Sequence, residues 1–406
     1  MARTLAALPE GSRITDYLSL GVITKTFPLI RVRSVLAATG KASLRERDLP
    51  AHMVVYYAIA LALYMQSSYR EVLRCLLEGV QWLRDPSVTL KVAGNSGISQ
   101  ARTRLGWEPL RQLHDEVVKP IAVAASRGAW YRTWRLVSLD GSTLDVADEQ
   151  ANEAAFGRPG ARRGCSAYPQ IRFVSLVENG THVLFGTRMG PYATGENRLA
   201  KAVLGALHQG MLCLADRGFF GVEMWQQALA TQAQLLWRIK KNSRLPGEKR
   251  LADGSYLSRI YPSEKDRRQQ TQAILVRVIE YRLAGVPGAE PIYRLVTSIL
   301  DPQQAPAQEL AALYHERWEI ETALDELKIH LRGARIVLRS KTPDLVRQEF
   351  YGLLMAHFAV RALMHEAALK ADEDPDRLSY LHAVRVVRRK LPAFHAIPPS
   401  GPESVS

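Results

Sequence analysis

The chain has 406 residues, a length that allows at least two domains and a large buried core. Lys and Arg total 54 against 40 Asp and Glu, so the formal net charge is +14. A surplus of this size favours a polyanionic partner, nucleic acid before membrane. The cysteines lie far apart without CxxC spacing, which argues against a disulfide framework and a zinc site and fits a reducing cytoplasm.

The first part of the chain, residues 1–125, is expected to be a helical domain. Its most apolar run, residues 53–65, is shorter than the roughly 20 residues that span a bilayer, so it predicts a buried core helix. Residues 97–106 predict a short helix on which Arg102 and Arg104 are exposed. A basic helix of this kind can lie on DNA, but plain helix packing gives the same pattern, and both interpretations stay open.

Residues 126–345 have the pattern of an α/β core. The expected elements are, in chain order, a strand at 134–140, a hairpin at 171–189 that turns at Asn179-Gly180, a helix at 196–210, a strand at 211–216, a helix from 221 and a strand at 233–240. This order indicates a mixed α/β sheet with an antiparallel edge. Residues 241–305 then predict a β-rich insertion, and residues 346–406 a helical C-terminal region.

Acidic side chains end two of the apolar strands. Asp140 follows the strand 134–140 and Asp216 follows the strand 211–216. A carboxylate at the end of a strand projects from the sheet edge into a crevice. An Asp that caps a strand-to-turn passage is the alternative at either position. Glu196, at the start of a helix, suits the helix dipole, and an auxiliary role in the site is its weaker alternative.

Residues 314–328 form a strongly charged helix with an unusual polar stripe. At about 100° per residue, Tyr314, Arg317, Glu321 and Lys328 fall within an arc of about 60° that borders the apolar face. A solvent-exposed helix with i,i+4 ion pairs is the ordinary alternative. Asp325 lies close to the same face and is the rival to Glu321 as an acidic ligand.

If the two strands are neighbours, the side chains of Asp140, Asp216 and Glu321 can meet at one point. Three carboxylates at that distance repel one another unless divalent cations neutralise them, and hard oxygen ligands select Mg²⁺, for which Mn²⁺ can substitute. Two such ions can activate an attacking hydroxyl and stabilise the leaving oxygen of a phosphodiester. Arg317 and Lys328 would then hold phosphates, and Tyr314 could donate a hydrogen bond to one.

The spacing Tyr314-x2-Arg317-x3-Glu321-x6-Lys328 resembles the Tyr-Arg-Glu-Lys signature of the insertion-sequence-four family of DDE transposases. "LVSLDGSTLD" and "LCLADRGFFG" are similar to the two Asp motifs of that family. The resemblance implies a ribonuclease-H-like core interrupted by a β-rich insertion between Asp216 and Glu321. It also implies cut-and-paste transposition of the encoding element by a nucleoid-associated homodimer, which acts in trans on terminal inverted repeats and target DNA through a DNA hairpin.

The same resemblance implies a set of roles. Asp140, Asp216 and Glu321 would be the metal ligands, and Tyr314, Arg317 and Lys328 would bind DNA phosphates. Tyr293 takes the position of a base-stacking Trp in the family, a departure that keeps an aromatic ring but offers less contact area.

Basic residues follow the charged helix closely, among them Arg335 and Arg339, and such a cluster suits a DNA track. A solvated surface is the alternative for these residues. For the whole chain, the alternatives to a transposase are a catalytically silent binder of inverted repeats and a ribonuclease-H-like nuclease of another class.

Overall fold

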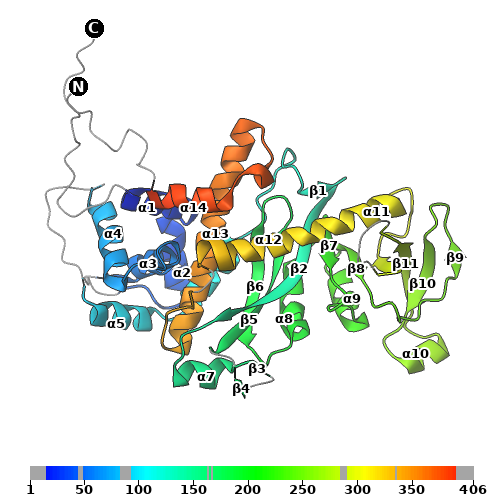
Figure 1. The fold of residues 1–406 in the computed structure, drawn as a ribbon, viewed down its shortest axis with the longest axis horizontal. Coiled ribbons are helices and arrows are strands. Elements are labelled where there is room, and N and C mark those ends of the chain that lie inside the picture. Colours follow the sequence, from blue (N-terminus) through cyan, green and yellow to red (C-terminus); the bar gives the residue numbers. More distant parts are fainter. Residues whose placement is uncertain are drawn as a thin grey trace, which may run out of the picture. The chain divides into compact units, whose positions relative to one another are not determined.

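The computed structural model describes residues 15–43, 49–82, 93–161, 164–165, 168–283, 290–333 and 336–389 (Figure 1). The chain folds into two compact units, each built from segments that are distant in sequence. The helical unit comprises Met1–Val118, Asp145–Ala155 and Asp325–Ser406, and the sheet unit comprises Lys119–Leu144 and Phe156–Leu324. The N-terminal and C-terminal helices therefore share one unit, whereas the sequence suggested separate regions with borders near residues 125 and 345.

The sheet unit is built on a ten-stranded sheet with the order β6-β5-β2-β7-β8-β12-β11-β10-β9, and β1 (Trp130–Tyr131) pairs with β2 off this path. At its centre β2 (Trp134–Asp145), β7 (Met211–Ala215) and β8 (Gln234–Arg238) run parallel. The antiparallel hairpin of β5 (Gln170–Glu178) and β6 (Val183–Pro191) adjoins β2. The predicted mixed α/β sheet is confirmed, although β2 continues past Asp140. The short strands β3 (Gly160–Ala161) and β4 (Gly164–Cys165) form a separate pair.

The β-rich insertion extends this sheet. β12 (Tyr293–Thr297) pairs antiparallel with β8, and β11 (Ile274–Tyr281), β10 (Tyr256–Ile260) and β9 (Lys249–Arg250) follow outward from it. Helix α10 (Glu264–Gln269) lies between β10 and β11 in the chain. The insertion thus places its residues in line with the parallel strands.

The segment after the insertion packs against the centre of the sheet. Besides α10, the described helices of the sheet unit are α8 (Glu196–Val203), η1 (Leu204–Ala206), α9 (Val222–Leu229), α11 (Ala307–Leu313), η2 (Tyr314–Trp318) and α12 (Glu319–Asp325). Leu310 of α11 and Tyr314 of η2 are buried in one cluster with Leu212 and Leu214 of β7. Each fully buried leucine contributes roughly 1.5–3 kcal/mol. This apolar contact fixes the orientation of α11 and η2 on the sheet, and with it the position of their polar side chains.

The helical unit surrounds the predicted core helix. Its helices are α1 (Thr15–Thr26), α2 (Leu29–Ala38), α3 (Ala51–Leu63), α4 (Tyr69–Trp82), α5 (Asn95–Leu105), α6 (Glu108–Val117), α7 (Gln150–Phe156), η3 (Glu326–Leu331), α13 (Pro343–Ala371), η4 (Pro375–Arg377) and α14 (Tyr380–Arg389). All side chains of α3 from Met53 to Leu63 are buried. Gly352 of α13 lies so close to the carbonyl of Ala58 that any side chain there would collide with it. Within the described ranges, none of the helices combines the length and apolarity needed to cross a membrane.

Candidate active site

Asp140 and Asp216 lie side by side at the carboxyl edge of the parallel strands. The register pairs Leu139 of β2 with Ala215 of β7, and the two aspartates are the next residue on each chain. Adjacent strands are about 4.8 Å apart, so the two carboxylates reach the same small volume. The side chain of Asp140 is 23% exposed, and the backbone N–H of Gly141 donates to its Oδ1 at 2.7 Å.

Glu321 of α12 is linked to Asp140 by the guanidinium of Arg317, which contacts both carboxylates. Arg317 lies in η2 and is 7% exposed. One of its terminal nitrogens lies 3.4 Å from Oδ2 of Asp140 and the other lies 3.3 Å from Oε1 of Glu321. Burial alone would lower the pKa of Arg317, but Tyr314 and the three acids raise it, so the guanidinium stays charged among them. The structure therefore gathers the three predicted acids around one arginine.

The acids carry more negative charge than Arg317 compensates. Burial, together with the carboxylates of Glu196 and Glu321, raises the pKa of Asp140 to about 6, in spite of the N–H of Gly141 and the charge of Arg317. A carboxylate held at such a cost is stabilised by any added cation. The donors are all carboxylate oxygens from three different elements, a set that fits Mg²⁺ or Mn²⁺ and offers no soft ligand.

Tyr314 is buried beneath the site. It is 7% exposed, and its hydroxyl donates to the carbonyl oxygen of Ala215 at 3.2 Å. Burial is the main reason why the pKa of Tyr314 is raised. The hydroxyl thus ties η2 to the residue that precedes Asp216, and it does not face solvent as a phosphate contact would.

The charged segment is not one uniform α-helix. Residues 314–318 form a 3₁₀ turn, 319–325 an α-helix and 326–331 a π-helix. The arc of about 60° assumed a constant α-helical rotation, which a 3₁₀ turn exceeds. Lys328 lies on the π-helical part, half-buried, within the helical unit. Asp325, the rival to Glu321, is exposed and also belongs to the helical unit.

The prediction that Arg102 is exposed for DNA contact is wrong. Its side chain is 3% exposed, and it donates to Oε1 of Gln348 at 2.7 Å and to Oγ of Ser340 at 3.0 Å. The signal was present in the sequence, because Ile98 and Leu105 lie three to four residues away on the same helix face.

The DNA contact predicted for Arg339 stays a prediction, because its half-buried side chain already has partners within the helical unit. Its guanidinium donates to the carbonyl of Ser67 at 2.5 Å and lies 4.9 Å from the ring centre of Tyr69. Two of its nitrogens are buried, so the side chain is committed to packing within the helical unit. Arg335 lies outside the described residues.

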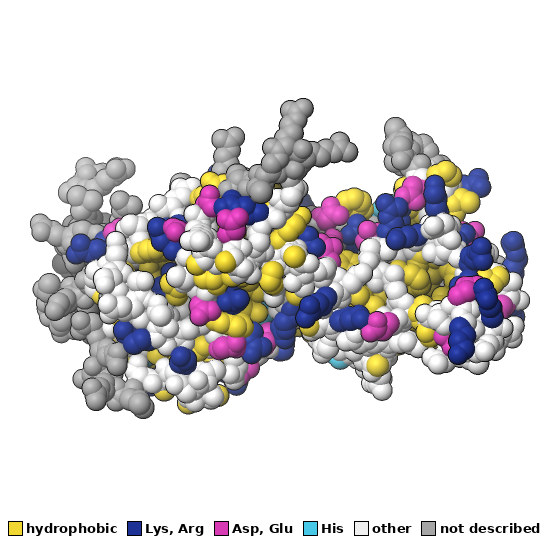
Figure 2. Space-filling view, turned by 90° about the horizontal axis from the view of Figure 1, so that it is seen from below, with side chains coloured by type: hydrophobic (Ala, Val, Ile, Leu, Met, Phe, Trp, Pro, Cys, Tyr) yellow, Lys and Arg dark blue, Asp and Glu magenta, His cyan; other side chains and the backbone are white. Residues whose placement is uncertain are grey.

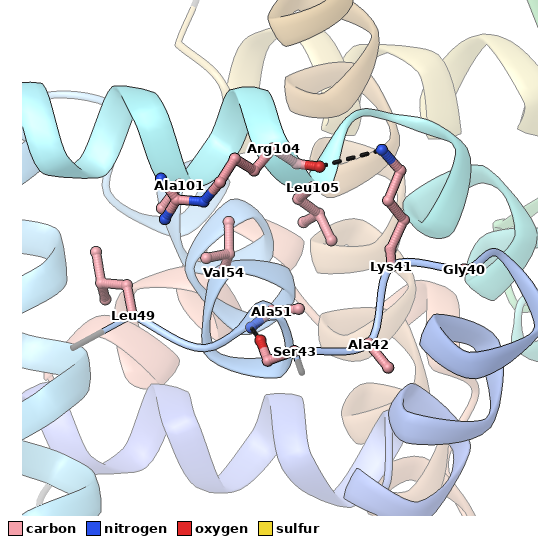
Figure 3. A pocket seen from close by; sticks show the side chains of 10 residues that line it. All are labelled: Gly40, Lys41, Ala42, Ser43, Leu49, Ala51, Val54, Ala101, Arg104 and Leu105. Carbon is pink, nitrogen blue, oxygen red and sulfur yellow. Dashed lines mark hydrogen bonds between the residues drawn. The ribbon is translucent and has the colours of Figure 1, made fainter. Parts of the chain in front are cut away.

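Arg104, in contrast, is exposed as predicted, and it lines a cavity of about 280 Å³ in the helical unit (Figure 3). Lys41 lies on the same cavity and donates to the backbone carbonyl of Arg104 at 3.1 Å. The described residues that line the cavity include these two cations and no acid. Arg104 remains a candidate for DNA contact.

Tyr293 lies at the start of β12 with its ring in an aromatic and cationic cluster. Its ring centre lies 5.3 Å from that of Tyr281 and 4.8 Å from the guanidinium carbon of Arg238. Arg238 also pairs with Glu290 at 2.8 Å. The ring is half-buried, and it is already engaged by these neighbours.

The sequence analysis missed a cationic extension of the same sheet edge. Ala215 of β7 pairs with Trp237 of β8, so Arg238 is the residue beside Asp216. Three exposed cations, Lys240, Lys241 and Arg244, follow in the next loop. Figure 2 shows further Lys and Arg side chains over the insertion strands of the sheet unit, at the right of the view. The "KK" run was visible in the sequence, but only the register of β7 and β8 shows that the strand before it ends beside Asp216.

Known proteins match the chain along most of its length. The family description "Insertion element 4 transposase N-terminal" matches residues 17–115, and "Transposase DDE domain" matches residues 134–359, more than half of the chain. The transposase InsG for insertion sequence element IS4 of Escherichia coli K12 is 28% identical over 371 residues, which cover 90% of this chain and 81% of the relative. The putative transposase InsZ of the same strain is 22% identical over 214 residues, covering 51% of this chain and 66% of the relative.

Among solved structures, the cryo-EM structure of a piggyBac transposase synaptic complex with hairpin DNA aligns over 92% of this chain and 80% of that chain. The TM-score is 0.48 at 10% sequence identity, which is too low to establish a common fold by itself.

Proposed function

Since the chain belongs to the IS4 family of DDE transposases, with a ribonuclease-H-like core, we propose that it cuts and joins DNA at the terminal inverted repeats of its own insertion sequence. The observation that carries this proposal is the bridge made by Arg317, which brings Glu321 from α12 to Asp140 on β2, beside Asp216. Three acids from three elements, with a buried guanidinium between them, form a site for phosphodiester chemistry.

In this proposal the three acids hold two Mg²⁺ ions, for which Mn²⁺ can substitute. When bound, the ions activate water or a 3′-hydroxyl on one side of the phosphodiester and stabilise the leaving oxygen on the other. Arg317 offsets part of the repulsion between Asp140 and Glu321 and offers its charge to the scissile phosphate. Tyr314 holds the end of β7, and with it Asp216, at a fixed distance from η2.

The DNA strand would follow the cationic edge of the sheet. Arg238 lies next to Asp216, and the loop with Lys240, Lys241 and Arg244 follows directly. This loop is held from behind, because Arg294 donates to the carbonyl of Ser243 at 3.0 Å. An anchored loop presents its cations at low entropic cost. Such cations bind the DNA backbone by releasing its counterions.

Family membership supports a proposal for the remaining steps of cut-and-paste transposition. We propose that two copies pair two transposon ends, and that each end passes through a DNA hairpin before it is joined to target DNA. In this scheme Lys328 contacts a phosphate and Tyr293 stacks on an unpaired base, for which its ring would have to separate from Tyr281 or Arg238. Its substrate places such an enzyme at the nucleoid in the cytoplasm.

The direct experiment uses purified protein with a duplex that ends in the inverted repeat found beside its gene. With Mg²⁺ the wild type is expected to nick the repeat end and to transfer the strand. Asp140→Asn, Asp216→Asn and Glu321→Gln should each abolish cleavage while gel-shift affinity for the repeat persists. Asp325→Asn is the matched control, since Asp325 is exposed, lies four residues from Glu321, and should leave cleavage intact.

Three outcomes would count against the proposal. Cleavage by any of the three acid variants would remove that residue from the site. Binding without cleavage under every divalent metal would identify a silent repeat-binding protein. Preference for branched junctions over repeat ends would point to a nuclease of another class.

A further inference from the structure

The turn between β5 and β6 contains a buried asparagine, Asn179. The pair Asn179-Gly180 predicts a tight two-residue hairpin, but the connection spans residues 179–182. The side chain of Asn179 is completely buried, which is unusual for an asparagine at a hairpin turn. A buried amide needs partners for its donors and its acceptor, so its contacts reveal what it holds.

Asn179 is bonded to the catalytic strand by two of its groups. Its backbone N–H donates to the carbonyl of Leu136 at 3.1 Å, and its Oδ1 accepts from the hydroxyl of Ser138 at 2.9 Å. Ser138 and Asp140 are two residues apart on β2, so their side chains face the same side of the sheet.

The other end of the same amide reaches the catalytic helix. Nδ2 of Asn179 donates to the backbone carbonyl of Glu316 at 2.8 Å. A carbonyl can only accept, so this contact fixes the orientation of the amide and leaves Oδ1 for Ser138. Glu316 precedes Arg317, and the bridge from Ser138 through Asn179 therefore runs parallel to the contact of Arg317 with Asp140.

Gly180 adds a second contact to the same segment. Its backbone N–H donates to the carboxylate of Glu319, whose side chain is only 13% exposed. Gly180 has a φ of +76°, and a side chain there would fall on the carbonyl of Arg127. The turn is therefore closely packed, and its contacts with Glu316 and Glu319 lie on either side of Arg317 in the chain.

We propose that Asn179, with Gly180, forms a clamp that sets the distance between Asp140 and Glu321, and that Asn179 is a positioning residue for the metal-dependent reaction. The inference rests on the proposed function, because it assigns the clamp to the carboxylates that would hold the metal ions. Groups that orient metal ligands from behind usually change metal affinity or activity by about 10–100-fold when they are removed.

The test compares three variants of the full-length protein. Asn179→Asp keeps the size and the acceptor for Ser138 but replaces the donor to Glu316 with an oxygen. Ser138→Ala removes only the strand side of the bridge. Ser175→Ala is the matched control, because Ser175 is a fully buried residue of the same hairpin whose hydroxyl bonds to Thr187 of β6, away from the clamp.

The readouts are the single-turnover cleavage rate at varied Mg²⁺, gel-shift affinity and thermal denaturation. For Asn179→Asp we expect about a 10–100-fold loss of rate at low Mg²⁺, because the removed donor orients metal ligands from behind. The half-saturating Mg²⁺ concentration should rise, saturating Mg²⁺ or Mn²⁺ should restore part of the rate, and DNA affinity should be unchanged. Ser138→Ala should show a smaller shift in the same direction, and Ser175→Ala should show none.

If Asn179→Asp has the Mg²⁺ requirement of the wild type while the separate variant Asp140→Asn is inactive, the clamp is rejected and the proposed function is left in place. An inactive wild type would reject the proposed function first. If Asn179→Asp does not fold, Ser138→Ala decides, since a Mg²⁺ requirement equal to that of Ser175→Ala would overturn the inference.

Discussion

The side chains at the centre of the site contact one another: Arg317 pairs with Asp140 and Glu321, and Tyr314 bonds to the residue before Asp216. The ends of two apolar strands predicted Asp140 and Asp216, and the spacing of the charged helix predicted Arg317 and Glu321. Spacing could not reveal that the hydroxyl of Tyr314 points to the carbonyl of Ala215, since this depends on the register between η2 and β7. The prediction that Arg102 is exposed relied on its charge, although its apolar neighbours on α5 indicated burial.

Asp140→Asn should stabilise the metal-free protein at neutral pH. The pKa of Asp140 is raised from 3.8 to about 6 by folding, so the folded state binds this proton more tightly and wild-type stability should rise as the pH falls from 6 to 3.8. Above pH 6 the variant should be more stable by about 1–3 kcal/mol, and near pH 4 the difference should vanish. Urea denaturation in EDTA measures both. Added Mg²⁺ should stabilise the wild type more than the variant, and an equal response would contradict metal binding at Asp140.

Tyr314→Phe distinguishes a buried strut from a phosphate contact. Loss of the hydrogen bond to Ala215 should cost about 0.5–1.5 kcal/mol of unfolding free energy, and DNA affinity should not change. Tyr56→Phe is the control, because the hydroxyl of Tyr56 is similarly bonded to the carbonyl of Phe27 at 2.8 Å. A large fall in DNA affinity with unchanged stability would show that the hydroxyl of Tyr314 faces DNA.

Arg102 and Arg104 should respond in opposite ways to the same substitution. Arg102→Ala removes the buried donor to Oε1 of Gln348 and to Oγ of Ser340 and should cost about 2–4 kcal/mol of stability. Arg104→Ala should change stability by less than about 0.5 kcal/mol and weaken DNA binding, as an exposed cation does. Chemical denaturation and filter binding measure the two effects. Equal stability losses would contradict the burial difference.

Among the elements, those with strong local patterns were predicted and those set by pairing were not. Continuous apolarity predicted α3 and the strands β7 and β8, which are buried as expected. The 3₁₀ and π-helical parts of the charged segment were not predictable from periodicity, because tertiary contacts select them. Glu326 of η3, for instance, accepts from Nε of Arg361 at 2.8 Å within the helical unit. The insertion strands were visible in the sequence, but their alignment with β8 was not.

The loop after β8 should carry part of the electrostatic attraction for DNA. Alanine at Lys240, Lys241 and Arg244 together should reduce the slope of log K against log salt by about 2–3, close to 0.9 for each phosphate that the loop no longer neutralises. Lys249→Ala with Arg250→Ala is the control, because β9 lies at the far end of the sheet from β7. If both sets change the salt slope equally, the loop has no special place on the DNA path.

At the scale of the whole molecule, composition and motif agree. A net charge of +14 fits a nucleic-acid partner, and two family descriptions together match both the N-terminal helices and the core. The sequence could not show that residues 325–406 join the N-terminal helices in one unit, because that grouping depends on contacts between segments far apart in the chain. In this arrangement the segment that begins with Tyr314 in the sheet unit continues into the helical unit at Asp325.

The central claim, that carboxylates from three elements hold the reactive metal ions together, is tested most directly by changing the ligand atom. In Asp140→Cys a thiolate replaces a carboxylate oxygen, and thiolates bind Mn²⁺ better than the harder Mg²⁺. The account predicts that this variant fails to cleave transposon ends with Mg²⁺ and regains cleavage with Mn²⁺, while Asp140→Ala stays inactive with both. Cleavage by Asp140→Cys and Asp140→Ala at the wild-type rate in Mg²⁺ would contradict it.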